Sequence, residues 1–219
     1  MKEEIDLLVN YPKTKRDLEG RAQTRTEMDR KIARQFGKDF FDGDRSTGYG
    51  GYTYNPRFWQ PVIPTFISRY NLNNNSKILD VGCGKGFMLY DFIQALPGIS
   101  VSGIDISEYA VSNGKKEVKE FLQVGNANSL PFADNSFDLV ISITTIHNLE
   151  RDGCKKALME IERVSKKDKF ITVDAYSNDN EKLRMDNWNL TALTYMSVDE
   201  WKVFFEESGY TGDYYWFIP

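Results

Sequence analysis

The chain contains little cysteine and histidine and no long apolar run. Its 219 residues include two cysteines, Cys83 and Cys154, and a single histidine, His147. So few sulfur and imidazole groups, at no metal-binding spacing, exclude a zinc-finger type of protein, and we expect no metal site. No apolar stretch approaches the roughly 18 residues of a membrane-spanning helix, so we expect no membrane partner.

An excess of basic charge is also missing. Lysine and arginine together number 28 against 32 aspartates and glutamates, which gives a formal net charge of −4. Because phosphate-binding faces are built from basic residues, this balance disfavours a nucleic-acid partner. Residues 1–6 are largely charged and differ from a secretory leader, so we expect a reduced, cytoplasmic protein. The sequence does not fix the oligomeric state, and a homodimer is one allowed assembly.

One segment carries more information than any other. Residues 77–87 read Lys-Ile-Leu-Asp-Val-Gly-Cys-Gly-Lys-Gly-Phe, an apolar run followed by a glycine-rich turn and a new apolar segment. A strand, a glycine loop and a helix in this order form the nucleotide-binding crevice of doubly wound sheets. Glycines also let a ligand approach the main chain, where a Cβ would block it.

The glycine spacing separates two chemistries. Gly82, Gly84 and Gly86 stand as G-x-G-x-G after Asp80, whereas a nicotinamide dinucleotide site has G-x-G-x-x-G. The pattern resembles the first motif of class I S-adenosylmethionine-dependent methyltransferases, and the resemblance extends over residues 77–174. The alternative is a tight turn that binds nothing.

The rest of the chain alternates between strand and helix patterns. We predict strands at 77–81, 100–105, 121–125, 137–143 and 169–174, a last strand at 210–218, and helices at 57–70, 87–96, 107–120, 151–165 and 198–208. A further helix is predicted between about residues 13 and 36, and 175–196 is read as irregular. This order predicts an α/β fold, a Rossmann-like, doubly wound, mostly parallel sheet of six to seven strands. We divide the chain into an N-terminal helical segment with a lid rich in glycine and tyrosine, 1–70, and a cofactor-binding methyltransferase domain, 71–219.

Asp105 ends the second predicted strand, 19 residues after Gly86. An acidic side chain there can accept hydrogen bonds from both ribose hydroxyls of a nucleoside, and Ile106 would lie against the adenine. The other role open to Asp105 is to cap the next helix. Related proteins often have Gly-Asp-Ala before Leu-Pro-Phe; here Asn126 replaces that aspartate, and its amide can still pair with adenine unless it serves only a polar turn. The resemblance thus implies these cofactor-binding residues: Asp80, Gly82, Cys83, Gly84, Gly86, Asp105, Ile106, Asn126, Ala127, Ile143 and Thr144.

The fourth predicted strand leads into a loop that holds His147. Parallel sheets bind ligands beyond the carboxyl ends of their strands, so this loop should lie where cofactor and acceptor meet. An imidazole titrates near neutral pH, which makes His147 the candidate general base. The alternative is a packed, hydrogen-bonded histidine without a catalytic role.

Aromatic residues gather on both sides of the predicted core. Such rings can exclude water or hold a sulfonium group, and they can equally pack the N-terminal helices onto the sheet. The candidates for a lid or substrate contact are Tyr49, Tyr52, Tyr54, Arg57, Trp59 and Trp188.

The resemblance implies an S-adenosylmethionine-dependent methyltransferase that transfers a methyl group to a hydroxyl, amine or carboxylate of a small molecule. The alternative is a cofactor-binding but inactive regulatory or partner subunit of the same fold. The sequence does not name the acceptor.

Overall fold

A computed structural model describes residues 3–13, 20 and 25–219. Its strands are β1 (Lys77–Val81), β2 (Ser100–Asp105), β3 (Leu122–Val124), β4 (Phe137–Ile143), β5 (Ser165–Tyr176), β6 (Met196–Ser197) and β7 (Asp213–Phe217). Its α-helices are α2 (Glu27–Ala33), α3 (Lys38–Phe41), α4 (Pro56–Trp59), α5 (Ile63–Tyr70), α6 (Phe87–Ala95), α7 (Glu108–Ser112), α8 (Arg151–Val164), α9 (Asp179–Trp188) and α10 (Val198–Glu207). Two short 3-10 helices, η1 (Lys119–Phe121) and η2 (Ile146–Asn148), complete the described elements.

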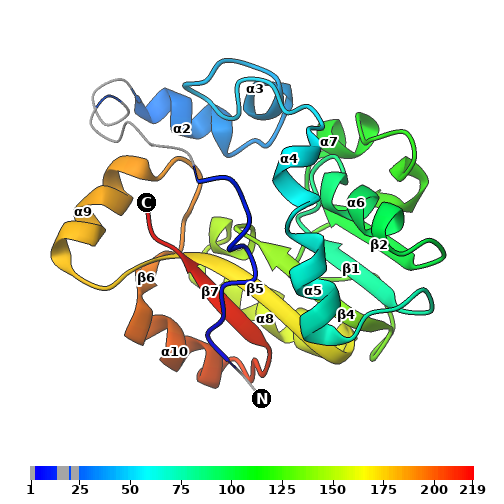
Figure 1. Ribbon diagram of the computed structural model, residues 1–219. Helices are drawn as coiled ribbons and strands as arrows, with labels where there is room; N and C mark the ends of the chain where they lie inside the picture. Colours follow the sequence, from blue (N-terminus) through cyan, green and yellow to red (C-terminus); the bar gives the residue numbers. More distant parts are fainter. Residues whose placement is uncertain (1–2, 14–19, 21–24) are drawn as a thin grey trace.

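The strands form one twisted sheet in the order β3-β2-β1-β4-β5-β6, and β7 also pairs with β5 (Figure 1). All strand pairings between these seven strands are parallel. The winding direction reverses between β1 and β4, and the loops that leave two such strands diverge and open a crevice at the carboxyl edge. The predicted fold class, a Rossmann-like doubly wound sheet of six to seven strands, is therefore confirmed.

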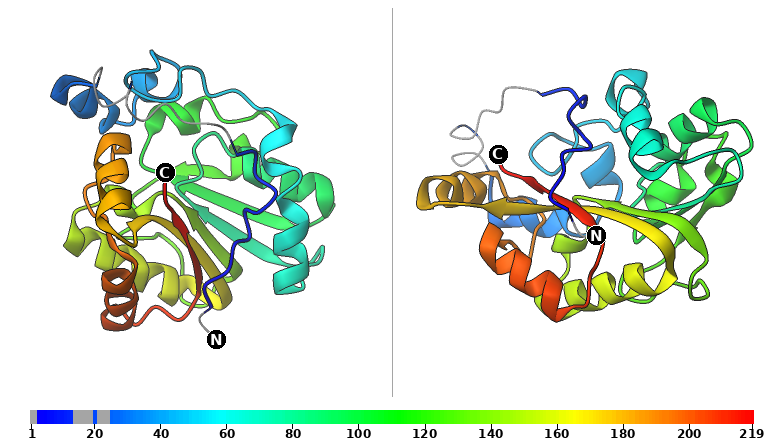
Figure 2. Two further views of the ribbon diagram at one scale, coloured as in Figure 1. Left: turned by 60° about the vertical axis from the view of Figure 1, so that its left-hand side comes forward. Right: turned by 60° about the horizontal axis from the view of Figure 1, so that its bottom comes forward.

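Helices cover both faces of the sheet (Figure 2), and each face buries its own apolar cluster. Neighbouring residues of β1 point to opposite faces, with Ile78 in one cluster and Leu79 in the other. Helices α8 and α10 cover the face of Leu79, and α5 and α6 cover the face of Ile78. Because both faces are covered, consecutive residues of β4 are apolar, with Leu139 and Ile141 in one cluster and Val140 in the other.

The N-terminal segment belongs to the same body as the sheet. The N–H of Ile5 donates to the carbonyl of Tyr214, and the N–H of Tyr214 donates to the carbonyl of Glu3. This short parallel pairing covers the outer edge of β7, which protects an exposed strand edge. Leu7 and Val62 share the apolar cluster of α6, so the predicted segments 1–70 and 71–219 contribute to one core. Within the described residues, every helix is too short or too polar to span a bilayer.

Several predicted helices differ from the observed ones. The helix predicted at 107–120 ends at Ser112, because Asn113 and Gly114, two residues that disfavour a helix interior, follow it. The helix predicted at 57–70 is divided into α4 and α5. Residues 179–188, read as irregular, form helix α9. Of the helix predicted between residues 13 and 36, only 27–33 is observed as α2, and residues 14–19 and 21–24 lie outside the described part.

Candidate functional site

The glycine loop between β1 and α6 has a backbone that only glycine adopts easily. Gly82, Gly84 and Gly86 have φ angles of +87°, +54° and +75°. Side chains are strained in this left-handed region, so the loop geometry requires all three glycines. A Cβ on Gly82 would also lie 2.1 Å from the Oγ1 of Thr145, in the loop after β4. The loops that leave β1 and β4 therefore meet at the point where the winding reverses.

Two carboxylates flank this loop. Asp105, at the end of β2, accepts hydrogen bonds from the N–H of Gly84 (2.7 Å) and the N–H of Ser107 (2.9 Å). Asp80, on β1, is only 6% exposed, and its carboxylate makes no hydrogen bond or ion pair with any described residue. Burial, and then the charge of Asp105, raise the pKa of Asp80 to about 7. Burial likewise raises the pKa of Asp105, which its two N–H donors partly offset.

The end of β4 is strained. Thr144 has a φ of +50°, which is uncommon for a residue with a branched Cβ. Its N–H is held by the carbonyl (3.0 Å) and the Oγ1 (2.9 Å) of Thr172 on β5. Backbone strain of this kind collects at functional sites, where the surrounding structure enforces it. Ile143 and Thr144 thus lie at the carboxyl edge, in the neighbourhood of the glycine loop.

Part of the tyrosine-rich segment covers the glycine loop. Tyr52 lies against Gly84, where a Cβ would be 3.3 Å from its Cε1, and its ring stacks on Phe87 with centroids 4.9 Å apart. Tyr49 packs on Tyr52 at 4.5 Å and is 41% exposed. Burial, and then the neighbouring phenol of Tyr49, raise the pKa of the Tyr52 hydroxyl. Tyr52 therefore lies against the glycine loop in its neutral form.

A buried ion pair fastens this segment to the loop. Lys85, between two of the glycines, donates through Nζ to a carboxylate oxygen of Asp42 (2.6 Å) and to the carbonyl of Tyr52 (2.8 Å). Asp42 also accepts from the Tyr109 hydroxyl (2.8 Å). Sequence reasoning missed this pair, although Lys85 belongs to the glycine motif, because Asp42 is 43 residues away. Figure 1 shows α2 and α3 above the carboxyl end of the sheet, as the contact requires.

The other lid candidates pack elsewhere. Tyr54 donates to Asp91 on α6 (2.6 Å). The Arg57 guanidinium lies over Phe58, and Trp59 packs edge-on against Tyr11. Trp188 ends α9, where its ring packs on Phe217 and under Arg25. Of the six predicted lid residues, Tyr52 lies against the glycine loop and Tyr49 packs on Tyr52, while Tyr54 also packs edge-on against Phe87 (centroids 5.7 Å).

The segment around Asn126 forms a local turn. The Oδ1 of Asn126 accepts from the N–H of Asn128 (3.1 Å), which is the polar-turn alternative of the sequence analysis. Ala127 packs at the margin of one apolar cluster, and Cys83 is buried with its thiol near the carbonyl of Gly84. Ile106, beside Asp105, keeps 52% of its surface exposed. An exposed isoleucine at this edge offers an apolar face to a ligand.

His147 is buried, with 3% of its surface exposed. Its Nδ1 accepts from the N–H of Asp174 (3.2 Å), and its Nε2 lies 3.6 Å from an Asp174 carboxylate oxygen. With Nδ1 as acceptor, the neutral ring carries its proton on Nε2. Burial lowers the pKa of the imidazole, and Asp174 partly opposes this. The carbonyl of His147 accepts from the N–H groups of Leu193 and Thr194, so this residue joins η2 to the segment after α9.

A comparison with protein families matches residues 72–209 to a methyltransferase domain. This match covers more than half of the chain and includes the glycine loop, Asp105 and η2.

Individual proteins and a solved structure are also similar to parts of the chain. A demethylmenaquinone methyltransferase of Symbiobacterium thermophilum is 36% identical over 126 residues, which are 53% of this chain and 49% of the relative. An uncharacterized protein of Haemophilus influenzae is 31% identical over 66% of this chain and 62% of its own length. The chain thus spans less than two thirds of either relative. The crystal structure of the YcgJ protein from Bacillus subtilis superimposes with a TM-score of 0.55 over 67% of this chain and 66% of that chain, at 22% identity.

Proposed function

The chain belongs to the methyltransferase domain family with the class I fold, and on that premise we propose that it transfers a methyl group from S-adenosylmethionine to a hydroxyl, amine or carboxylate of a small molecule. One observation carries the proposal: three left-handed glycines lie between two buried carboxylates at the point where the sheet reverses its winding. That is where open α/β sheets bind nucleotides.

The residues present fit the cofactor. Asp105 uses two acceptor directions on backbone N–H groups, and a carboxylate has about four, so two stay available for ribose hydroxyls. Asp80 has a buried carboxylate with no hydrogen bond, and Ile106 offers an exposed apolar surface for the adenine. S-adenosylmethionine, when bound, supplies an electrophilic methyl group on sulfur. We assign the backbone of Gly82, Gly84 and Cys83 to the wall that the cofactor contacts.

The protein's own share of the reaction is alignment and exclusion of water. When the nucleophile and the methyl group are held in a fixed geometry, the entropy loss of bringing two free molecules together no longer adds to the activation barrier. Tyr52 lies against the glycine loop and Tyr49 packs on Tyr52, so we propose that these two residues form the lid over the cofactor. The contacts of Tyr54 and Trp59 with α6 and Tyr11 support a packing role for these two residues.

Two roles were open for His147. Removal of an acceptor proton needs a free lone pair that faces the acceptor, whereas both ring nitrogens here face Asp174. The carbonyl of His147 accepts two hydrogen bonds, which link η2 to residues 193–194. These contacts favour a positioning role, in which His147 holds the loop after β4 against the end of β5.

The test measures cofactor binding and product release on the same protein. Calorimetry with S-adenosylmethionine should show one site, and incubation with a panel of small hydroxyl, amine and carboxylate compounds should release S-adenosylhomocysteine only when an acceptor is present. Binding without release for every compound would favour the inactive-subunit alternative. Absence of binding by the folded protein would contradict the proposal itself.

A further inference from the structure

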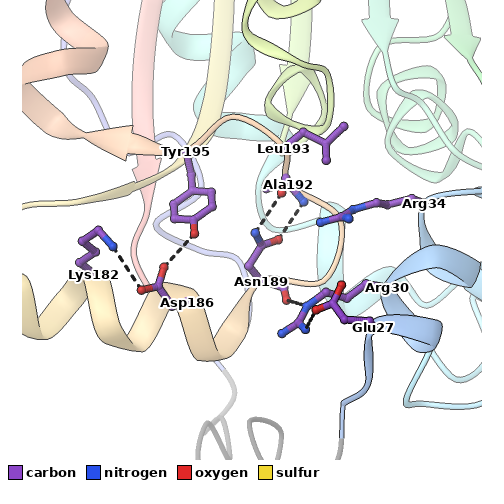
Figure 3. A pocket seen from close by; sticks show the side chains of 9 residues that line it. All are labelled: Glu27, Arg30, Arg34, Lys182, Asp186, Asn189, Ala192, Leu193 and Tyr195. Atoms are coloured by element: carbon purple, nitrogen blue, oxygen red, sulfur yellow. Dashed lines mark hydrogen bonds and ion pairs between the residues drawn. The ribbon is translucent and has the colours of Figure 1, made fainter.

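A cavity of about 530 Å³ lies between the N-terminal segment and the segment around α9 (Figure 3). Its volume is in the range of sites for small organic ligands. Helix α2 forms one wall, and α9 with the following loop forms the other. The residues that line it are Glu27, Arg30, Arg34, Lys182, Asp186, Asn189, Ala192, Leu193 and Tyr195.

Most of the charged groups in this cavity are already paired. Arg30 contacts Glu27 at 2.5 Å, and Lys182 lies 3.3 Å from Asp186. The hydroxyl of Tyr195 donates to Asp186 (2.8 Å). Each acidic lining residue therefore already has a cationic partner, so a ligand cation is not needed to pair it.

Arg34 is different. It follows the last turn of α2 and extends into the cavity toward the loop of Asn189 and Ala192 (Figure 3). Its guanidinium makes no hydrogen bond or ion pair with any described residue, and its Nε is buried without a partner. A buried donor without an acceptor costs about 1–3 kcal/mol, more for a charged group, and a ligand acceptor beside Nε would remove this cost. Asn189 cannot supply one, because its side chain is bonded twice to Ala192 (2.9 and 2.8 Å).

The cavity adjoins the edge of the sheet where we place methyl transfer. The lining residue Leu193 donates to the carbonyl of His147, in η2 (3.0 Å). The residue before η2, Thr145, lies against Gly82 of the glycine loop. Residues 145–148 thus contact both the cavity wall and the glycine loop. The cavity and the proposed cofactor site are therefore neighbours on the two sides of η2.

We propose that Arg34 binds an oxyanion of the methyl acceptor, so that the acceptor is a small molecule with a carboxylate or phosphate group. A guanidinium presents a planar fork of N–H donors that matches both anions. That the bound molecule is a methyl acceptor rests on the proposed methyltransferase function. The anion site itself can be tested without any transfer reaction.

The experiment follows backbone and arginine Nε–H signals by NMR while inorganic phosphate or acetate is added at constant ionic strength, with sodium chloride as the reference. We expect saturable shifts of the Arg34 Nε–H signal and of the amides of residues 189–195. Arg34→Gln should weaken binding about tenfold or more, as followed on those amides. Arg34→Lys keeps the charge without the fork and should also weaken it. The matched control is Arg184→Gln, an exposed arginine of α9 outside the cavity lining, which should bind like the parent protein.

The anion arms also distinguish the two acceptor classes: tighter binding of phosphate indicates a phosphorylated acceptor, and tighter binding of acetate indicates a carboxylate. The proposed anion site would be refuted if the NMR shift changes equalled those seen with sodium chloride, or if they were unchanged in Arg34→Gln. Calorimetry with S-adenosylmethionine on the same samples keeps the two proposals apart. Loss of cofactor binding with intact anion binding refutes the methyltransferase function alone, whereas the reverse result refutes the anion site alone.

Discussion

Replacing Asp80 by asparagine should stabilise the ligand-free protein and weaken its cofactor binding. Asp80 is buried on β1 without a hydrogen bond, and its pKa is raised to about 7, mainly by burial and then by the charge of Asp105. A raised carboxyl pKa means that the folded state binds a proton which the unfolded chain has already lost. At neutral pH the ionised carboxylate therefore destabilises the folded, ligand-free protein.

The size of the effect follows from the two pKa values. The interval from the ordinary value of 3.8 to about 7 corresponds to about 4 kcal/mol at roughly 1.36 kcal/mol per pKa unit. Relaxation and water entry reduce this figure, so we expect a gain of about 2 kcal/mol for Asp80→Asn above pH 7. For a chain of this size that gain raises the melting temperature by about 4–8 °C. The gain should shrink as the pH falls through 7 and vanish near pH 4, where the carboxyl is protonated in both states.

Urea denaturation of the ligand-free proteins at pH 5, 6, 7 and 8 measures this difference directly. The control is Asp44→Asn, which changes an exposed aspartate and should leave the free energy of unfolding unchanged at each pH. Calorimetry should show that Asp80→Asn loses about tenfold or more in affinity for S-adenosylmethionine, because a charged acceptor is lost. A variant that is less stable than the parent at pH 8, or a gain that does not change with pH, would refute the reasoning.

Three further substitutions test the other parts of the site. Asp105→Ala removes the proposed ribose acceptor and should lower cofactor affinity at least about tenfold by calorimetry, while unchanged affinity would reject the assignment. Lys85→Met breaks the buried contact with Asp42 and should speed hydrogen exchange of residues 39–54; equal exchange would show that the ion pair does not hold the lid. His147→Gln should reduce kcat by less than about tenfold and leave the acidic limb of the pH–rate profile in place; disappearance of that limb would restore the general-base role. In the same variant, unfolding stability should lose the decline below pH 6.5 that a buried neutral histidine with a lowered pKa produces.

The central strands were predictable because their signals are local. The observed bounds of β1, β2 and β4 coincide with the predicted ranges. Each strand has buried apolar residues on both faces of the sheet, and a glycine, serine or threonine follows within two residues. The glycine loop was predictable for the same reason, since three left-handed residues at fixed spacing leave a pattern in consecutive residues.

The elements that shape the candidate acceptor cavity left no such pattern. In α9 only Met185 is buried, so the helix shows no apolar stripe, and its stability comes from the Asn178 cap and from distant contacts. Arg25, for example, donates to the carbonyl of Trp188 at the end of α9, 163 residues away (2.7 Å). The placement of Arg34 opposite α9 likewise depends on tertiary packing. Sequence spacing cannot supply contacts of that range.

The most direct test of the account is calorimetric titration of S-adenosylmethionine into the intact protein and into Gly84→Val. Gly84 has a φ of +54° and lies against Tyr52, so a branched side chain there would be strained and would block the backbone surface that we assign to the cofactor. We predict that S-adenosylmethionine binds the parent protein at one saturable site. It should not bind Gly84→Val, although the circular dichroism spectrum of this variant shows that it is folded. NAD should bind neither protein. Equal affinity of the parent and the folded variant for S-adenosylmethionine would contradict the claim that the glycine loop is its binding site.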